Sequence, residues 1–268
     1  MTDIALTIAG SDSGGGAGIQ ADLKAMSALG VYGASVITAI TAQNTRAVTA
    51  VEEVSPAVIA AQIAAVRDDL DIKAIKIGML SSAPIIETVA DGLRGFAGPV
   101  VLDPVMVAKS GDALLRDDAV AALKEHLLPL ATLLTPNLPE AARLLSTGSA
   151  WSEDAMLDQG EALLAFGPKS VLMKGGHGEG DDCVDFLISE GQVPVAFRAE
   201  RLATKNTHGT GCTLSSAIAA GLAKGLDATQ AVGEAHAYLQ GAIRAADTLS
   251  IGSGHGPVHH FHDLWPAP

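Results

Sequence analysis

Residues 204–216 read TKNTHGTGCTLSS, and this stretch decides how the rest of the chain is interpreted. Gly209 and Gly211 lead directly into a helix pattern of small residues that begins near Cys212. A helix N-terminus presents unpaired backbone N–H groups and a partial positive charge, and glycines let that backbone approach an anion closely. The same field would favour the thiolate of Cys212. The stretch therefore predicts an anion hole at Gly209, Thr210 and Gly211 beside a titratable cysteine. An ordinary glycine-rich turn before a buried helix is the alternative.

Short apolar runs alternate with helical patterns on both sides of this stretch. Strands are expected at 4–9, 35–41, 74–79, 100–103, 133–136, 170–174 and 184–188. Helices are expected after the first glycine turn as far as 29, and at 55–70, 84–93, 117–128, 139–145, 153–166, 213–224 and 228–248. Such alternation predicts an α/β fold with a mostly parallel central sheet and helices on both faces. Because no linker-like run interrupts the pattern, we expect one domain over residues 1–268.

The charge balance restricts the partners. Seventeen Lys and Arg against 30 Asp and Glu give a net charge of −13, which argues against nucleic acid or an anionic membrane as a partner. The two cysteines, Cys183 and Cys212, form no disulfide framework and fit a reducing cytosol. No signal-peptide pattern and no apolar run of about 18 residues is present, so a cytoplasmic protein without a spanning helix is expected.

The glycines after the first strand invite a dinucleotide interpretation. Gly16, Gly18 and Ala21 satisfy the spacing G-x-G-x-x-[GA]. That motif also requires an acidic residue about 20 positions later, at the end of the next strand. The next strand ends in Gln43 instead, and the chain has no G-x-x-x-x-G-K-[ST] loop. These observations argue against both an NAD site and a Walker-type site.

Four motifs in order resemble a known family. They are AGSDSGGGAGIQAD at 9–22, TPNLPE at 135–140, MKGGH at 173–177 and NTHGTGC at 206–212. Together they resemble the ribokinase-like family in its hydroxymethylpyrimidine and phosphomethylpyrimidine kinase branch. The similarity covers essentially the whole chain, including GPVHHFH at 256–262. It implies an ATP- and Mg²⁺-dependent homodimeric kinase of thiamine biosynthesis. Its substrates would be 4-amino-5-hydroxymethyl-2-methylpyrimidine and then the monophosphate of that alcohol.

The resemblance assigns roles to the phosphate-binding residues. Gly209, Thr210 and Gly211 would hold the transferred phosphate, and Cys212 would take the hydroxyl proton. Most ribokinase-like enzymes have Asp at that position, whereas the pyrimidine kinase branch has Cys. Lys174 ends an apolar strand before two glycines, so it would point at a ligand phosphate. A surface lysine whose stem covers apolar atoms is the alternative.

The glycine run after the first strand would line the substrate pocket in this family. Gly10, Gln43 and Met79 all fall at the carboxyl ends of expected strands, where ligands bind in open α/β sheets. The amide of Gln43 has a donor and an acceptor and suits the edge of an aminopyrimidine; the alternative is a polar residue that caps a strand end. Asp22 would bond a ring donor of the substrate, or it would be a solvated carboxylate in the first turn of a helix.

Asn137 and Glu140 match the family's N-x-x-E magnesium motif, and Mg²⁺ prefers such oxygen ligands with several retained waters. The same spacing also fits an N-cap with a reciprocal capping glutamate, and both interpretations can hold at once. Asp103 would help to organise the cation or would cap its turn. Residues 109–112 are expected to form a mobile loop, and the resemblance implies that such a loop can close over the site.

Other residues carry weaker signals. His259, His260 and His262 could suggest a metal site, but we interpret them as packing and hydrogen-bonding groups of the tail. Cys183 is expected to be inert. A pyridoxal kinase of the same fold and a non-catalytic ligand-binding protein remain the alternative functions.

Overall fold

The computed structural model describes residues 2–106, 116–176 and 181–265, in which nine strands form one sheet. The strand order is β3-β2-β1-β4-β5-β6-β7-β8-β9. The strands are β1 (Ile4–Asp12), β2 (Tyr32–Gln43), β3 (Val48–Glu53), β4 (Ala74–Ile77), β5 (Val100–Leu102), β6 (Leu133–Leu134), β7 (Ser170–Lys174), β8 (Asp182–Ser189) and β9 (Val195–Glu200). The ladder from β2 through β1, β4, β5 and β6 to β7 is parallel, and β3, β8 and β9 join it antiparallel.

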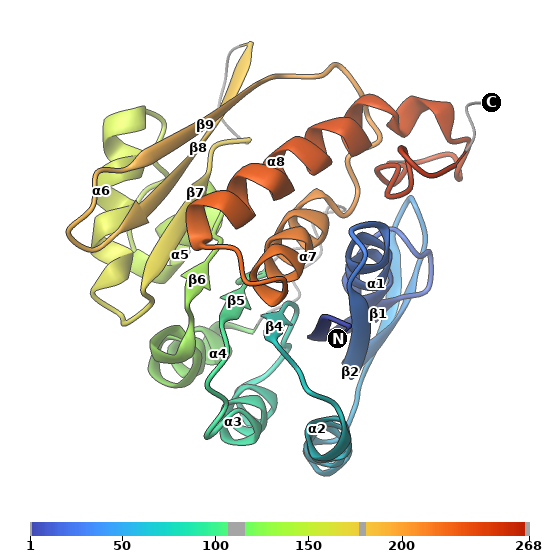
Figure 1. Cartoon of the computed structure of the whole chain (residues 1–268), viewed down its shortest axis with the longest axis vertical. Helices are drawn as coiled ribbons and strands as arrows, with labels where there is room; N and C mark the ends of the chain where they lie inside the picture. Colours follow the sequence, from blue (N-terminus) through green and yellow to red (C-terminus); the bar gives the residue numbers. More distant parts are fainter. Residues whose placement is uncertain (1, 107–115, 177–180, 266–268) are drawn as a thin grey trace.

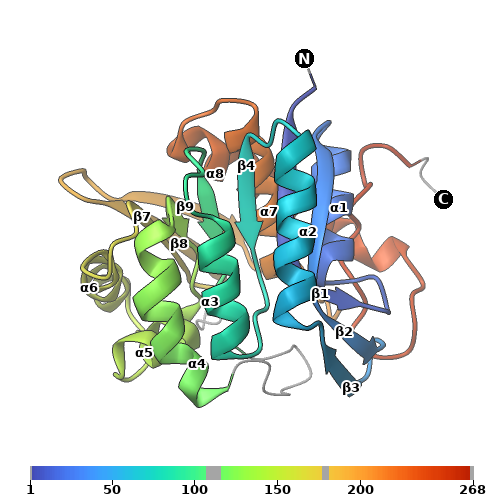
Figure 2. The ribbon, with the colours of Figure 1, turned by 90° about the horizontal axis from the view of Figure 1, so that it is seen from below.

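Helices cover both faces of the sheet (Figures 1 and 2). One face carries α2 (Pro56–Asp69), α3 (Ala83–Gly92), α4 (Asp117–Ala122), α5 (Leu138–Leu145) and α6 (Glu153–Leu164). The other carries α1 (Gly18–Ala28), α7 (Thr210–Ala223) and α8 (Ala228–Arg244). Both faces of β4 and β5 are buried, because a parallel strand between two helix layers meets no solvent. The predicted mostly parallel sheet with helices on both faces is confirmed.

Two strands of the structure were not expected, and two expected helices have different ends. Strands β3 and β9 were not predicted, because their side chains are mostly exposed or half-buried and neither strand shows a hydrophobic run. The helix expected at 117–128 ends as α4 at Ala122 and continues as a π-helical turn at Leu123–Leu127 and a 3-10 turn at Leu128–Leu130. Pro129 has no N–H to donate, which disfavours a regular helix there. The helix expected at 228–248 ends as α8 at Arg244, with a 3-10 turn at Ala246–Thr248.

The carboxyl ends of the parallel strands meet along one edge of the sheet. This edge carries Gly10, Gln43, Met79, Asp103 and Lys174, from five strands or the segments that follow them. Residues that are distant in sequence are therefore gathered on one side of the fold. Within the described ranges, no helix is long and apolar enough to cross a membrane.

Candidate active site

Helix α7 starts at Thr210, three residues earlier than expected, so Gly211 and Cys212 belong to its first turn. Gly209 is the N-cap and adopts φ +81°, a left-handed conformation that favours glycine. A Cβ at this position would also collide with the carbonyl oxygen of Gly16. Among the described side chains, none caps this helix end. Its N-terminal N–H groups and dipole are thus suited to an anionic ligand.

An ion pair lies directly beside this helix end. Lys174 Nζ is 2.8 Å from Asp103 Oδ1, and the two side chains are 13% and 2% exposed. A Cβ on Gly211 would lie 3.5 Å from both Lys174 Nζ and Asp103 Oδ2, so the pair faces the first turn of α7. Burial disfavours the Lys174 ammonium, but the charges of Asp103 and Glu140 more than offset this and raise the lysine's pKa. Lys174 is therefore a permanent cation, and it is not the surface lysine of the alternative interpretation.

Cys212 differs from the expectation. Burial raises the pKa of its thiol to about 11, and the charges of Asp22 and Asp103 act in the same direction. The nearby ammonium of Lys76 and a backbone hydrogen bond from Gly18 lower the pKa but do not prevail. The prediction that the helix field favours the thiolate is wrong for the ligand-free protein, because desolvation outweighs that field. Cys212 is a neutral thiol at neutral pH.

Asp22 also differs from both interpretations of the sequence. Its Oδ1 accepts a hydrogen bond from Ser216 Oγ at 2.6 Å, and its Oδ2 accepts one from Thr7 Oγ1 at 2.6 Å. Lys76 Nζ lies 2.9 and 2.8 Å from the two oxygens, and both charged side chains are completely buried. The carboxylate is not solvated, and the predicted contact with a substrate ring does not fit a group already occupied by three donor groups. Lys76 was missed, although a lone lysine in the apolar run 74–79 was a signal.

Asn137 and Glu140 form a complete capping box at the start of α5. Asn137 Oδ1 accepts from the Glu140 N–H at 2.9 Å, and Glu140 Oε2 accepts from the Asn137 N–H at 2.8 Å. The capping interpretation is thus confirmed. Burial raises the pKa of Glu140 to about 7; Asp103 raises it further, whereas Lys174 opposes the shift. The carboxylates of Glu140 and Asp103, whose charges repel each other, and the amide oxygen of Asn137 together are a donor set that suits Mg²⁺. The metal role stays a prediction.

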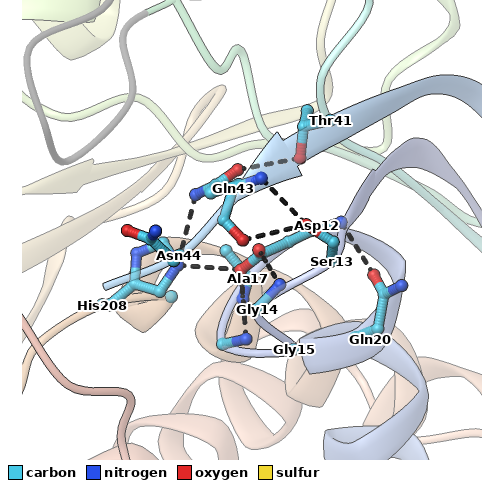
Figure 3. Close-up of polar contacts among 12 residues, drawn as sticks. Asp12, Ser13, Gly14, Gly15, Ala17, Gln20, Thr41, Gln43, Asn44 and His208 are labelled. Carbon is cyan, nitrogen blue, oxygen red and sulfur yellow. Dashed lines mark hydrogen bonds and ion pairs between the residues drawn. The ribbon is translucent and has the colours of Figure 1, made fainter. Parts of the chain in front are cut away.

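The predicted substrate residues lie at the other end of the same edge. A Cβ on Gly10 would lie 3.0 Å from Met79 Sδ, so these two residues pack together. Gln43 ends β2 beside His208 and the glycine turn, as Figure 3 shows. Asp12 holds this turn together through hydrogen bonds from the N–H groups of Gly14, Gly16 and Ala17.

Asp12 and His208 belong to the two glycine-rich motifs, but no functional role was predicted for either residue. Asp12 Oδ2 lies 2.9 Å from His208 Nε2, and both residues are buried. This contact joins the first glycine motif to the segment before α7. Spacing alone could not reveal it, because 195 residues separate the two positions.

The remaining signals fall elsewhere. His260 Nε2 lies 3.0 Å from Thr213 Oγ1, and the rings of His259 and Trp265 meet edge to face. The described part of the chain, with the histidine tail, has no group of three metal-binding side chains. Cys183 is a free thiol in β8. The predicted loop at 109–112 lies outside the described residues. A cavity of about 450 Å³ lies between α2 and α3, and none of the predicted site residues lines it.

Known proteins share this chain's sequence and fold. A family model described as phosphomethylpyrimidine kinase matches residues 12–259. The hydroxymethylpyrimidine/phosphomethylpyrimidine kinase of Rhizobium meliloti (strain 1021) is 62% identical over 265 residues, which is 99% of each chain. The thiamine biosynthesis bifunctional protein ThiED of Geobacter sulfurreducens is 51% identical over 258 residues, 96% of this chain and 52% of that protein.

A solved structure confirms the ribokinase-like fold. The ADP complex of Bacillus subtilis pyridoxal kinase superposes with a TM-score of 0.90 at 36% identity, over 98% of this chain and 100% of that one. The matched residues 12–259 include most of the first glycine-rich motif, from Asp12 onward, all of the motif at 206–212 with Cys212, and Lys174. The chain therefore belongs to the phosphomethylpyrimidine kinase family.

Proposed function

We propose that this protein uses ATP to phosphorylate 4-amino-5-hydroxymethyl-2-methylpyrimidine, and then phosphorylates the resulting monophosphate to the diphosphate, in thiamine biosynthesis. The observation that carries the proposal is the position of the Lys174–Asp103 ion pair against the first turn of α7. It places a permanent cation beside a helix end that no described side chain caps. The names of the Rhizobium and Geobacter relatives support the substrate and the pathway.

Phosphoryl transfer depends on positioning and on neutralising charge more than on covalent chemistry. In the proposed mechanism, the N–H groups at Gly209, Thr210 and Gly211 hold the transferred phosphate, and Lys174 neutralises part of its charge. Asn137, Glu140 and Asp103 would hold Mg²⁺ through water. When bound there, the ion would supply positive charge to the phosphates of ATP.

The two phosphorylations make different demands on Cys212. In the first step the nucleophile is a neutral hydroxyl, which must lose a proton as it attacks. Cys212 can accept that proton only as a thiolate, and its raised pKa makes the thiolate scarce in the ligand-free protein. In the second step the nucleophile is a phosphate oxygen, which is already mostly ionised near neutral pH because the second pKa of a phosphate monoester is about 6.

A pyridoxal kinase activity is the second candidate, and the likeness to the Bacillus pyridoxal kinase favours it. The test is ATP turnover with the pyrimidine alcohol, its monophosphate and pyridoxal, each supplied alone with Mg²⁺. We expect turnover with both pyrimidines. Turnover with pyridoxal alone would favour the second candidate. If none of the three compounds supports ATP hydrolysis or phosphoryl transfer, the result would favour a non-catalytic ligand-binding protein.

We further infer a single-domain, cytoplasmic homodimer that binds neither nucleic acid nor membranes. Tyr32, Ile40 and Val51 of β2 and β3 are 59%, 55% and 43% exposed, at the edge of the sheet. Exposed apolar side chains on such an edge favour burial against a second copy. Light scattering coupled to size-exclusion chromatography tests the homodimer, since the measured mass should be twice the 27.1 kDa of one chain.

A further inference from the structure

One ring nitrogen of His208 faces two partners with opposite requirements. His208 Nε2 lies 2.9 Å from Asp12 Oδ2 and 3.4 Å from the side-chain nitrogen of Gln43 (Figure 3). An imidazole nitrogen carries either a proton or a lone pair. A proton at Nε2 suits the Asp12 carboxylate, whereas a lone pair at Nε2 suits the amide N–H₂ of Gln43. Both contacts cannot be hydrogen bonds at once.

The Asp12 side of this conflict is fixed. Asp12 accepts three backbone N–H groups, from Gly14, Gly16 and Ala17, at 2.8 to 3.0 Å. Burial disfavours the Asp12 carboxylate, but the hydrogen bond and charge of His208 and the N–H groups of Ala17 and Gly14 outweigh burial and lower the pKa of Asp12, so it is an anion that only accepts. A bare His208 Nε2 at 2.9 Å would place a lone pair against that anion. His208 Nε2 must therefore carry a proton.

The hydrogen bonds on the other side of the Gln43 amide also conflict, and the same orientation of the amide resolves them. The single hydroxyl proton of Thr41 faces the Ser11 carbonyl oxygen at 2.9 Å and Gln43 Oε1 at 3.1 Å. It can be donated fully to only one of them. If the Gln43 amide is turned by 180°, its nitrogen donates to Thr41 Oγ1, which donates to Ser11. Asp12, at 2.9 Å, remains the main acceptor of the His208 Nε2 proton, and the Gln43 oxygen becomes a second, weaker acceptor of the same proton. No donor then faces a donor in these contacts.

We propose that Asp12 and His208 are positioning residues that fix the Gln43 amide with its oxygen toward His208 and its nitrogen toward Thr41. This inference rests on the proposed function, in which Gln43 reads the substrate ring. In this orientation the amide keeps one oxygen lone pair and one N–H for a ligand. Adjacent acceptor and donor sites complement the amine and ring nitrogen of an aminopyrimidine. Pyridoxal has no ring amine, so the same arrangement favours the aminopyrimidine over pyridoxal.

Nitrogen-15 NMR of the ligand-free protein tests the proton assignment without any activity. We expect His208 to carry its proton on Nε2, alone or together with Nδ1, and Asp12→Asn to alter that signal. A bare Nε2 with the proton on Nδ1 would overturn the proposal. Because this readout needs no substrate, its failure is distinguishable from a failure of the proposed function.

A double-mutant cycle tests the coupling of His208 to Gln43. We expect Gln43→Leu and His208→Leu each to lower kcat/KM for the pyrimidine alcohol roughly 10-fold, mostly through KM, because a polar atom of the ligand loses its partner. The double variant should be no worse than Gln43→Leu alone, and His208→Gln, which restores an N–H donor, should recover most of the loss. The KM for ATP should barely change. Independent, multiplying losses would overturn the proposal.

His255 offers the matched control. It borders the same small cavity as Gln43 and His208, but it is exposed, and its Nδ1 contacts the backbone oxygen of Lys205. His255→Leu should leave the pyrimidine KM unchanged. An equal effect at His255 and His208 would show a general disturbance of this region and would overturn the specific role of His208. Thermal unfolding of each variant confirms that the compared proteins are folded.

Discussion

Lys76 Nζ lies 2.8 Å from Asp22 Oδ2, with both side chains completely excluded from solvent. The pair joins β4 to α1, and Ser216 extends it to α7. Ser215, the neighbouring residue of α7, lies 3.5 Å from Asp103 Oδ2 in the Lys174–Asp103 pair. Consecutive serines therefore connect the helix that carries Cys212 to two buried ion pairs, one structural and one facing the phosphate site.

Breaking the buried pair should destabilise the protein strongly. Lys76→Met leaves Asp22 as an unpaired buried charge, which typically costs about 3–5 kcal/mol of the free energy of unfolding. Lys76→Met combined with Asp22→Asn should lose much less, because no buried charge remains. Urea unfolding measures each loss. Lys73→Met, which breaks a surface pair with Asp71, is the control and should change little. Equal losses at Lys73 and Lys76 would refute the structural role of the buried pair.

Glu140→Gln should separate capping from metal binding. Glutamine can still accept the Asn137 N–H, so the capping box and the fold should survive. The substitution removes a carboxyl group that can ionise beside Asp103 when Mg²⁺ binds, and we expect the Mg²⁺ concentration for half-maximal rate to rise several-fold. Glu153→Gln, at the exposed start of α6, should leave that concentration unchanged. A variant that unfolds while its Mg²⁺ dependence stays normal would leave capping as the sole role of Glu140.

Cys212→Ala should impair the two phosphorylations unequally. A general base contributes about 10²–10⁴-fold when a hydroxyl must lose its proton. Phosphorylation of the alcohol should fall by such a factor, whereas phosphorylation of the monophosphate should fall far less. Assays with each substrate alone decide the matter. Equal losses in both steps would mean that Cys212 acts by shaping the anion hole.

The raised pKa of Cys212 adds a pH signature. With a thiol pKa of about 11, the thiolate fraction of the ligand-free protein rises about tenfold per pH unit below that value. kcat/KM for the alcohol should therefore climb with pH between 7 and 9 in the wild-type protein. The Cys212→Ala variant should show no such rise with the alcohol. With the monophosphate as substrate, kcat/KM of the wild-type protein should level off over the same pH range. A flat wild-type profile for the alcohol would contradict proton transfer to the Cys212 thiolate.

His260 should make folding sensitive to acid. Burial lowers its pKa to about 4, and the charge of Lys24 adds to the shift. A depressed native pKa stabilises the fold above the unfolded value of about 6.5, and this contribution disappears as pH falls toward 4. The loss should be on the order of 3 kcal/mol. His260→Gln should flatten the fall in unfolding free energy between pH 6.5 and 4, and His255→Gln should not. Parallel curves for His260→Gln and wild type would refute this contribution.

The order of the strands and helices follows from the sequence, because central strands between two helix layers are continuous apolar runs such as Val100–Leu102. The exposed edge strands β3 and β9 carry no such pattern, and only pairing with β2 and β8 reveals them. The sequence likewise indicates which residues gather at the carboxyl edge of the sheet, since parallel strands end on the same side.

The charges within the site could not be predicted in the same way. The burial of Asp22 depends on Lys76, which lies 54 positions away, and the acidity of Cys212 depends on how completely its surroundings exclude water. Spacing rules describe neighbours on one helix or strand, whereas these effects arise between elements. Asp12 and His208 belong to sequence motifs that are easily recognised, yet their contact forms only where β1 and the segment before α7 come together in the fold.

The measurement that tests the central claim most directly is the stoichiometry of ATP consumption with the pyrimidine alcohol as the only acceptor. The alcohol, excess ATP and Mg²⁺ are incubated with the protein, and the products are followed by phosphorus NMR. We predict that the monophosphate appears first and the diphosphate second, with two ATP consumed for each pyrimidine. A reaction that stops at one ATP and the monophosphate, or a mixture in which no ATP is consumed, would contradict the proposed function.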